Sequence, residues 1–141
     1  MGKRVLRPGG RELTRRMLEQ LDIQPHDAVV EFAPGMGVTA RMTLSRNPAS
    51  YTAIERDEAA AAQVRSYLTG PNQRCHLGNA ERTGLDDQSA TVVYGEAMLT
   101  MQGAEQKRKI VAEAFRLLKP GGRYGIHELG FTPDDLPRDI Q

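Results

Sequence analysis

Residues 28–40 place a short apolar strand, a glycine-containing loop and the start of a helix directly one after another. The strand spans 28–32, the loop 33–37 and the helix about 38–45. Apolar residues on both faces indicate a strand that is covered on both sides, as in a parallel sheet. Glycines permit a tight turn, and the free N–H groups of the following helix carry a partial positive charge. This order predicts an α/β fold with a ligand site at the end of the strand.

The rest of the chain continues the alternation of helices and strands. Further strands are expected at 51–55, 74–77, 90–94 and 123–129, and further helices at 11–21, 58–68 and 104–118. Asp57 is well placed to cap the second of these helices, and Lys119-Pro120-Gly121-Gly122 is expected to form a turn that ends the last one. Strands separated by helices imply right-handed crossovers, so we expect a doubly wound, Rossmann-like parallel sheet.

Length and composition limit the class of protein. The chain has 141 residues, of which 39% are hydrophobic and 26% charged, which suits one domain with a real core. No apolar run approaches the roughly 20 residues of a membrane span, and Pro8-Gly9-Gly10 follows the basic start where a signal peptide would be apolar. Cys75 is the single cysteine, so we expect no disulfide framework and no metal site. A soluble, cytoplasmic protein is the resulting expectation.

Basic side chains gather at the start of the chain. Residues 1–16 contain six basic residues and one acidic residue. A solvated helix face is the simpler interpretation, and an anionic partner such as phosphate, nucleic acid or a membrane surface is the alternative. No aromatic residues alternate with the basic ones, although single-stranded nucleic acid usually needs aromatic side chains for base stacking. Nucleic acid is therefore not the expected partner.

Two acidic residues, Glu31 and Glu55, lie near the ends of the two strands on either side of the predicted loop and its helix. Glu55 lies at the end of the second strand, twenty residues after Gly35, where a carboxylate can accept both hydroxyls of a ribose. Taken alone, Gly35-x-Gly37-x-x-Ala40 also matches the dinucleotide fingerprint, which keeps a nicotinamide-dependent oxidoreductase open. Glu31 would repel a pyrophosphate and attract an ammonium group, which favours a nucleoside ligand that carries an amino group.

Four short motifs lie on the expected strand ends in one order along the chain. They are the acidic residue and loop Glu31-Phe32-Ala33-Pro34-Gly35-Met36-Gly37, the acid Glu55, Gly78-Asn79-Ala80, and Leu117-Leu118-Lys119-Pro120-Gly121-Gly122. Together they resemble the class I S-adenosylmethionine-dependent methyltransferases, with Ala33 and Asn79 in place of that family's glycine and aspartate. The resemblance covers about residues 5–130 and is to small-molecule members. It implies the strand order 3-2-1-4-5, without the last two strands of the usual seven-stranded sheet.

The resemblance also implies a cofactor, S-adenosyl-L-methionine, and a small-molecule methyl acceptor. Glu31 would hold the methionine ammonium, Glu55 the ribose hydroxyls, and Asn79 the adenine edge. The expected cofactor-binding residues are Glu31, Ala33, Pro34, Gly35, Met36, Gly37, Glu55, Arg56, Asn79, Ala80 and Gly95. Catalytic residues are not identified, and Glu96 and His127 are the candidates for handling an acceptor proton. A surface acid and a core histidine are the plain alternatives for this pair.

The same interpretation divides the chain into three segments. Residues 1–22 would form a basic arm and lid helix, 23–130 the cofactor-binding domain, and 131–141 the start of a truncated C-terminal segment. The fifth strand would then be an exposed sheet edge, which favours pairing with a second copy as a homodimer. A non-catalytic cofactor-binding or assembly module of the same fold is the main alternative, followed by an oxidoreductase and an RNA methyltransferase.

Overall fold

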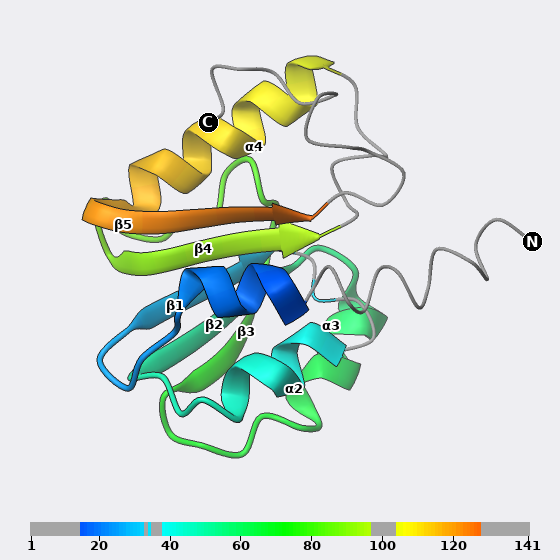
Figure 1. Ribbon diagram of the computed structural model, residues 1–141. Coiled ribbons are helices and arrows are strands. Elements are labelled where there is room, and N and C mark those ends of the chain that lie inside the picture. Colours follow the sequence, from blue (N-terminus) through cyan, green and yellow to red (C-terminus); the bar gives the residue numbers. More distant parts are fainter. Residues whose placement is uncertain (1–14, 33, 35–37, 97–103, 128–141) are drawn as a thin grey trace, which may run out of the picture.

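The computed structural model describes residues 15–32, 34, 38–96 and 104–127 (Figure 1). Within them, five parallel strands form one sheet in the order β3-β2-β1-β4-β5. The strands are β1 (Ala28–Phe32), β2 (Ser50–Glu55), β3 (Gln73–Leu77), β4 (Ala90–Glu96) and β5 (Leu118–His127). The predicted strand order and Rossmann-like architecture are therefore confirmed.

Helices cover both faces of this sheet. They are α2 (Val38–Leu44), α3 (Glu58–Arg65) and α4 (Ala104–Leu117), and residues 15–21 are also helical. Helix α4 lies on one face, while residues 15–21, α2 and α3 lie on the other (Figure 1). A sheet covered in this way buries both sides of its strands, which is why β1 is almost wholly apolar.

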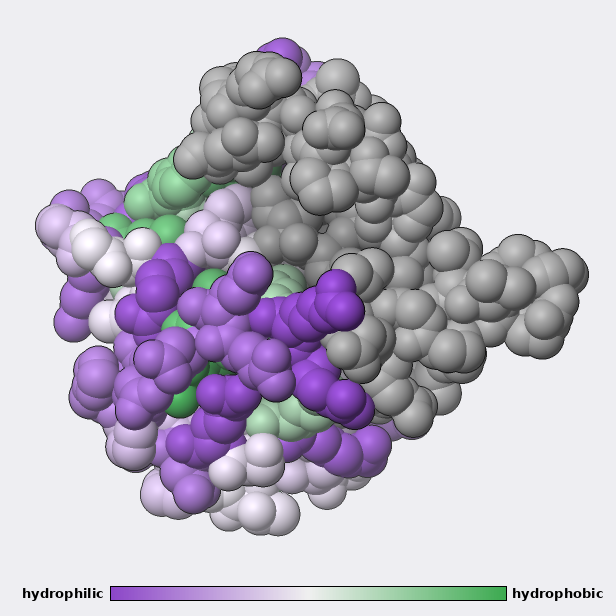
Figure 2. Space-filling model, viewed as in Figure 1, coloured by the Kyte–Doolittle hydropathy of each residue, from purple (hydrophilic) through white to green (hydrophobic). Residues whose placement is uncertain are grey.

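Alternate residues of β1 divide the core into two layers. Val29 packs with the helices of one face, and Val30 and Phe32 pack with α4 on the other. The described part of the first helix belongs to the first layer, because Met17, Leu18 and Leu21 are buried in it. The outer surface is largely hydrophilic over α2 and α3, and hydrophobic residues appear there only in small areas (Figure 2).

Helix α3 begins as predicted and ends earlier. The Asp57 side chain accepts a hydrogen bond from the Ala60 N–H at 2.8 Å and caps the helix. The helix ends at Arg65, whereas the sequence predicted residue 68. The backbone N–H groups of Tyr67 and Leu68 bond to carbonyls three residues back, so the chain tightens into turns over the last predicted residues.

Strand β5 differs from the prediction at its start. It begins directly after α4 and includes Lys119–Gly122, which the sequence analysis took for a turn. Ala90 pairs with Leu118 and Val92 pairs with Arg123, so the intervening residues of β5 bulge out of the ladder. Gly121 has a φ of 83°, which favours glycine. The expected change of direction is therefore present as a bulge inside the strand.

Three predicted features fall wholly or partly outside the described residues. They are the start of the first helix, at 11–14, the end of the fifth strand, at 128–129, and the segment 131–141. Residues 78–89 connect β3 to β4 through turns and contain no helix. None of the helices in the described ranges has the length and apolar character that crossing a bilayer requires.

Candidate functional site

The carboxyl ends of β1, β2 and β4 meet at one edge of the sheet. Phe32, the last residue of β1, pairs with Ile54 of β2 and with Gly95 of β4. A Cβ atom on Gly95 would lie 3.2 Å from the Cβ of Phe32, so the glycine permits a close approach of β4 to the end of β1. Pro34 is buried, and α2 begins at Val38. Ala33, Gly35, Met36 and Gly37 of the predicted loop lie outside the described residues.

Glu55 stands at this edge with its side chain held in place. The residue is 9% exposed, and its Oε2 accepts a hydrogen bond from the Asp57 N–H at 3.2 Å. Its carbonyl oxygen accepts the Gly78 N–H at 2.9 Å. A carboxylate fixed next to the end of β1 has two oxygens that suit it to accept hydrogen bonds from two vicinal hydroxyls. The following residue, Arg56, is exposed.

The Gly78-Asn79-Ala80 segment continues from β3 beside Glu55. The Asn79 carbonyl accepts the Arg82 N–H at 3.1 Å and closes a turn. Ala80 is buried in the α4-facing core layer. The Gly78 N–H is bonded to the Glu55 carbonyl, and Asn79 is the next residue along the chain. The turn that carries Asn79 therefore begins close to Glu55. Two of the predicted cofactor-binding segments are thus brought together.

A buried network fastens this connection to α4. The N–H and hydroxyl of Thr83 donate to Glu113 Oε2 at 2.9 Å and 2.6 Å, and Arg116 Nη2 donates to the same oxygen at 2.6 Å. Arg116 also binds the Leu85 carbonyl at 2.8 Å and the Asp87 carboxylate. The Arg116 hydrogen bond, against the opposing effect of burial, lowers the pKa of Glu113 to about 2. The sequence analysis did not identify these residues, because Thr83 and Glu113 lie 30 positions apart.

Glu31, the residue expected to hold the ligand ammonium, is the second-last residue of β1. It is fully buried beneath the helices of the first core layer. Its Oε1 accepts hydrogen bonds from Tyr51 Oη at 2.5 Å and from Tyr94 Oη at 3.1 Å. Tyr94 Oη is also hydrogen-bonded to Thr43 of α2. Neither tyrosine was predicted from the sequence, because only the strand register brings them to Glu31.

The two catalytic candidates lie on neighbouring strands. Glu96 of β4 pairs in the sheet with His127 of β5, and each is the last residue of its strand. The register therefore brings their backbones to the same sheet edge as Glu55. Within the described ranges, no group of three or more His, Cys, Asp or Glu side chains is arranged to hold a metal ion.

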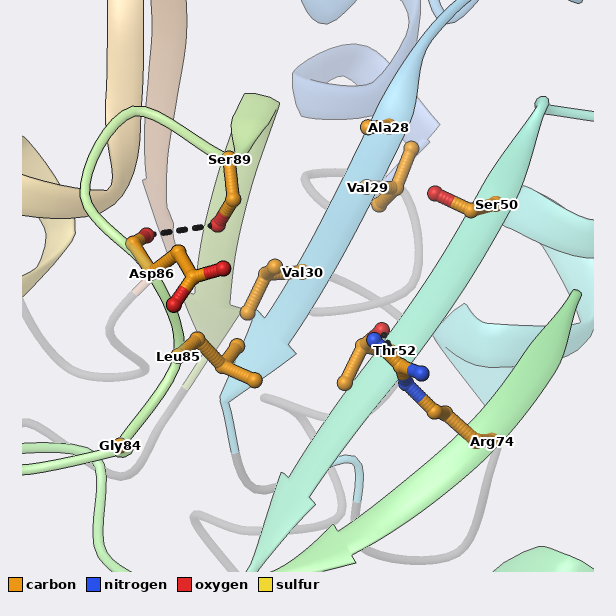
Figure 3. Close-up of a pocket in the computed structure, with 10 residues that line it drawn as sticks. All are labelled: Ala28, Val29, Val30, Ser50, Thr52, Arg74, Gly84, Leu85, Asp86 and Ser89. Atoms are coloured by element: carbon orange, nitrogen blue, oxygen red, sulfur yellow. Dashed lines mark hydrogen bonds between the residues drawn. The ribbon is translucent and has the colours of Figure 1, made fainter.

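A cavity of about 290 Å³ lies elsewhere, against the amino-terminal halves of the strands. Figure 3 shows Val30 between the connection that carries Leu85 and Asp86 and the strands that carry Thr52 and Arg74. Its lining residues are Ala28, Val29, Val30, Ser50, Thr52, Arg74, Gly84, Leu85, Asp86 and Ser89. None of the predicted cofactor-binding residues is among them. The cavity is therefore separate from the edge that carries Glu55.

Comparison with known proteins identifies similar chains. A family model described as "Methyltransferase domain" matches residues 29–122. An uncharacterized protein of Haemophilus influenzae is 32% identical over 139 residues, which cover 96% of this chain and 55% of that protein. The present chain thus spans about half the length of this curated relative.

Solved structures share the fold at low sequence identity. An S-adenosylmethionine-dependent methyltransferase from Methanosarcina mazei matches with a TM-score of 0.68 and 20% identity, over 78% of this chain and 55% of that one. The [4+2]-cyclase SpnF matches with a TM-score of 0.70 and 20% identity, over 83% of this chain and 44% of that one. At this identity the likeness shows the fold alone, and the second example shows that the fold does not by itself fix the reaction.

Proposed function

This chain belongs to the methyltransferase-domain family, and from that premise we propose that it binds S-adenosyl-L-methionine and methylates a small-molecule acceptor. The observation that carries the proposal is Glu55, a nearly buried carboxylate fixed at the end of β2, next to the end of β1. When bound, the cofactor supplies a methyl group on a sulfonium, which is activated for transfer to a nucleophile.

The residues of the chain bind and orient. Glu55 accepts hydrogen bonds from the ribose hydroxyls, and its Oε2 is held by the Asp57 N–H so that little ordering remains on binding. The turn at Asn79 and Ala80 contacts the adenine edge, and its anchoring to α4 through Thr83 keeps it in place. Precise orientation of the reacting groups lowers the activation barrier by up to about 7–11 kcal/mol in favourable cases. Binding and orienting the cofactor is therefore the main contribution of the protein to methyl transfer.

The remaining roles concern the acceptor and the assembly. Glu96 and His127 lie next to each other at the ends of β4 and β5, which suits them to positioning an acceptor or removing its proton. Strand β5 is an edge of the described sheet, which supports the proposed homodimer. A cytoplasmic location and a small-molecule acceptor, in preference to RNA, remain predictions from the sequence.

Calorimetric titration of the 141-residue chain tests the cofactor. We expect S-adenosylhomocysteine to bind with a micromolar dissociation constant and NAD not to bind. Glu55→Ala should weaken the first ligand at least about tenfold, because two hydrogen bonds to a charged group are lost. Glu58→Ala removes a neighbouring acid that is exposed on α3 and should leave the affinity unchanged. Equal affinity of the wild type and Glu55→Ala would contradict the proposed site.

One residue favours the alternative of a non-catalytic module. Asn79 carries an amide where the resembled family has a carboxylate, so this position offers no negative charge to the cofactor. A chain that binds S-adenosylmethionine but releases no S-adenosylhomocysteine with amine, hydroxyl or thiol acceptors would support this alternative. Steady release with one acceptor class would support the enzyme.

A further inference from the structure

The carboxylate of Glu31 is buried where a charge is expensive. Glu31, Tyr51 and Tyr94 are each 0% exposed. The sheet register explains the grouping. Glu31 pairs with Tyr94 of β4 on one side and with Ala53 of β2 on the other. Tyr51 lies two residues before Ala53, so its side chain is on the same face of the sheet. A buried carboxylate is stable only when hydrogen bonds replace its lost hydration. The two tyrosines supply such bonds to a single oxygen.

The bonds to Glu31 Oε1 have a defined direction. Tyr51 Oη donates at 2.5 Å and Tyr94 Oη donates at 3.1 Å. Burial, and next the nearby Glu31, raises the pKa of Tyr51 well above its ordinary value, so this phenol keeps its proton. Because Tyr94 donates to Glu31, its oxygen is left to accept from the Thr43 hydroxyl of α2. A chain of hydrogen bonds therefore runs from α2 through Tyr94 to the acid.

The hydrogen-bonded cluster of Glu31, Tyr51, Tyr94 and Thr43 lies near the end of β1, where the proposed ligand binds. Glu31 is the residue before the end of β1, and Thr43 belongs to the helix that follows the loop 33–37. A negative charge fixed here acts through a medium of lower dielectric constant than water, so its attraction for a cation is strengthened. Hydrogen bonds between a carboxylate and phenols also restrict the rotamer of the acid.

We propose that Tyr51 and Tyr94 are positioning residues for the cofactor: their hydroxyls hold the Glu31 carboxylate in one orientation and so set the affinity for the ammonium of the methionine moiety. The inference rests on the proposed function and adds to it two residues and a physical role. Neither tyrosine touches the ligand in this scheme, because each acts through Glu31. The two phenols therefore govern selectivity for an amino-acid-bearing nucleoside over a simple one.

Two ligands separate this role from a purely structural one. S-adenosylhomocysteine carries the ammonium, whereas 5′-methylthioadenosine has the same adenosine and sulfur without the amino acid part. Tyr51→Phe and Tyr94→Phe should weaken the first about tenfold and change the second less than twofold, because only the first senses the carboxylate. Both affinities are measured by calorimetry on the full chain.

Matched variants make the test specific. Tyr67→Phe removes a phenol whose Oη is buried without a hydrogen-bond partner in the described structure, so it should change neither affinity. Glu31→Gln keeps the shape of the side chain and should reproduce the selective loss for S-adenosylhomocysteine. Adding Tyr94→Phe to Glu31→Gln should then cause no further selective loss, because the charge that the phenol positions is already gone.

The outcomes are distinct. Equal losses of both ligands in the tyrosine variants, or no loss, would overturn the inference while leaving the proposed function intact. Failure of the wild-type chain to bind S-adenosylhomocysteine would overturn both. Circular dichroism checks folding, and if Tyr51→Phe does not fold, Tyr94→Phe and Glu31→Gln still decide between the selective and the equal loss.

Discussion

At the scale of single residues, Asp27 shows how much of the fold depends on one buried carboxylate. It is 1% exposed and lies just before β1. Its Oδ2 accepts the Gln24 N–H at 2.7 Å and Arg123 Nη2 at 2.8 Å, and its Oδ1 accepts the Thr91 hydroxyl at 2.8 Å. Burial acts to raise the pKa of Asp27, but these donors outweigh burial and the pKa is lowered. The residue joins the starts of β1 and β4 to β5.

Asp27→Ala should therefore destabilise the chain by about 3 kcal/mol, because it leaves a guanidinium, a hydroxyl and an N–H without their acceptor. Urea unfolding followed by circular dichroism measures the change. Asp86→Ala is the matched control, since that carboxylate is exposed, and it should change stability by less than about 0.5 kcal/mol. A loss below about 1 kcal/mol for Asp27→Ala would show that the network contributes little.

Prediction from sequence succeeded for residues whose position follows from the strand they end. Glu55 was predicted at the end of the second strand and Asn79 just after the third, and the structure places them there. The surroundings of Glu31 were not predictable, because its partners Tyr51 and Tyr94 lie 20 and 63 residues away. Such contacts depend on strand register, which a local pattern does not specify.

At the scale of elements, the bulge in β5 shows two glycines with different requirements. Gly121 needs a positive φ of 83°, but nothing lies within 4 Å of the place a Cβ would take. At Gly122 a Cβ would lie 2.9 Å from the Lys119 carbonyl oxygen and 3.1 Å from that of Thr91. The first position is limited by backbone conformation and the second by close contact with the backbone.

Gly122→Ala should thus cost more stability than Gly121→Ala. For Gly121→Ala we expect about 1 kcal/mol from the left-handed conformation, and for Gly122→Ala about 2–3 kcal/mol, because backbone atoms must move. Gly84→Ala is a control for the conformational term alone, since its φ is 81° and the space around it is open. Thermal unfolding gives the order, and a smaller loss for Gly122→Ala than for Gly121→Ala would contradict the contact argument.

Element positions were predictable to within a few residues where the pattern is local. The strand at 28–32 was predicted with its observed bounds, and the structure confirms Asp57 as the cap of the helix that follows. The segment Lys119–Gly122 was not, since its glycines fit a turn and a bulge equally well and only pairing with β4 distinguishes them.

At the scale of the whole molecule, the topology was the most predictable feature. Alternating strands and helices with right-handed crossovers leave few ways to order a parallel sheet, and the resemblance to methyltransferases selected the order that is observed. The proposed methyl acceptor could not be predicted in the same way, because acceptor recognition depends on side chains gathered from several elements.

The response of the whole molecule to acid follows from its two anchored carboxylates. Glu113 has a folded-state pKa of about 2 against an ordinary value of 4.5, and the pKa of Asp27 is also lowered. A group whose pKa is lower in the folded state binds fewer protons there than in the unfolded chain. The stabilisation by the Glu113 carboxylate is therefore complete above pH 4.5 and is lost as the pH falls toward 2.

Glu113→Gln should consequently lower stability at pH 7 by on the order of 1–2 kcal/mol, allowing for the solvent screening of the partly exposed Arg116. The difference from the wild type should shrink as the pH approaches 2, because the wild-type carboxyl is then also becoming neutral. Melting temperatures at pH 7, 5, 3 and 2 measure this convergence, with Glu58→Gln as an exposed control. A gap that stays constant across this range would mean that Glu113 stabilises the link to α4 through its shape and hydrogen bonds, with no contribution from its charge.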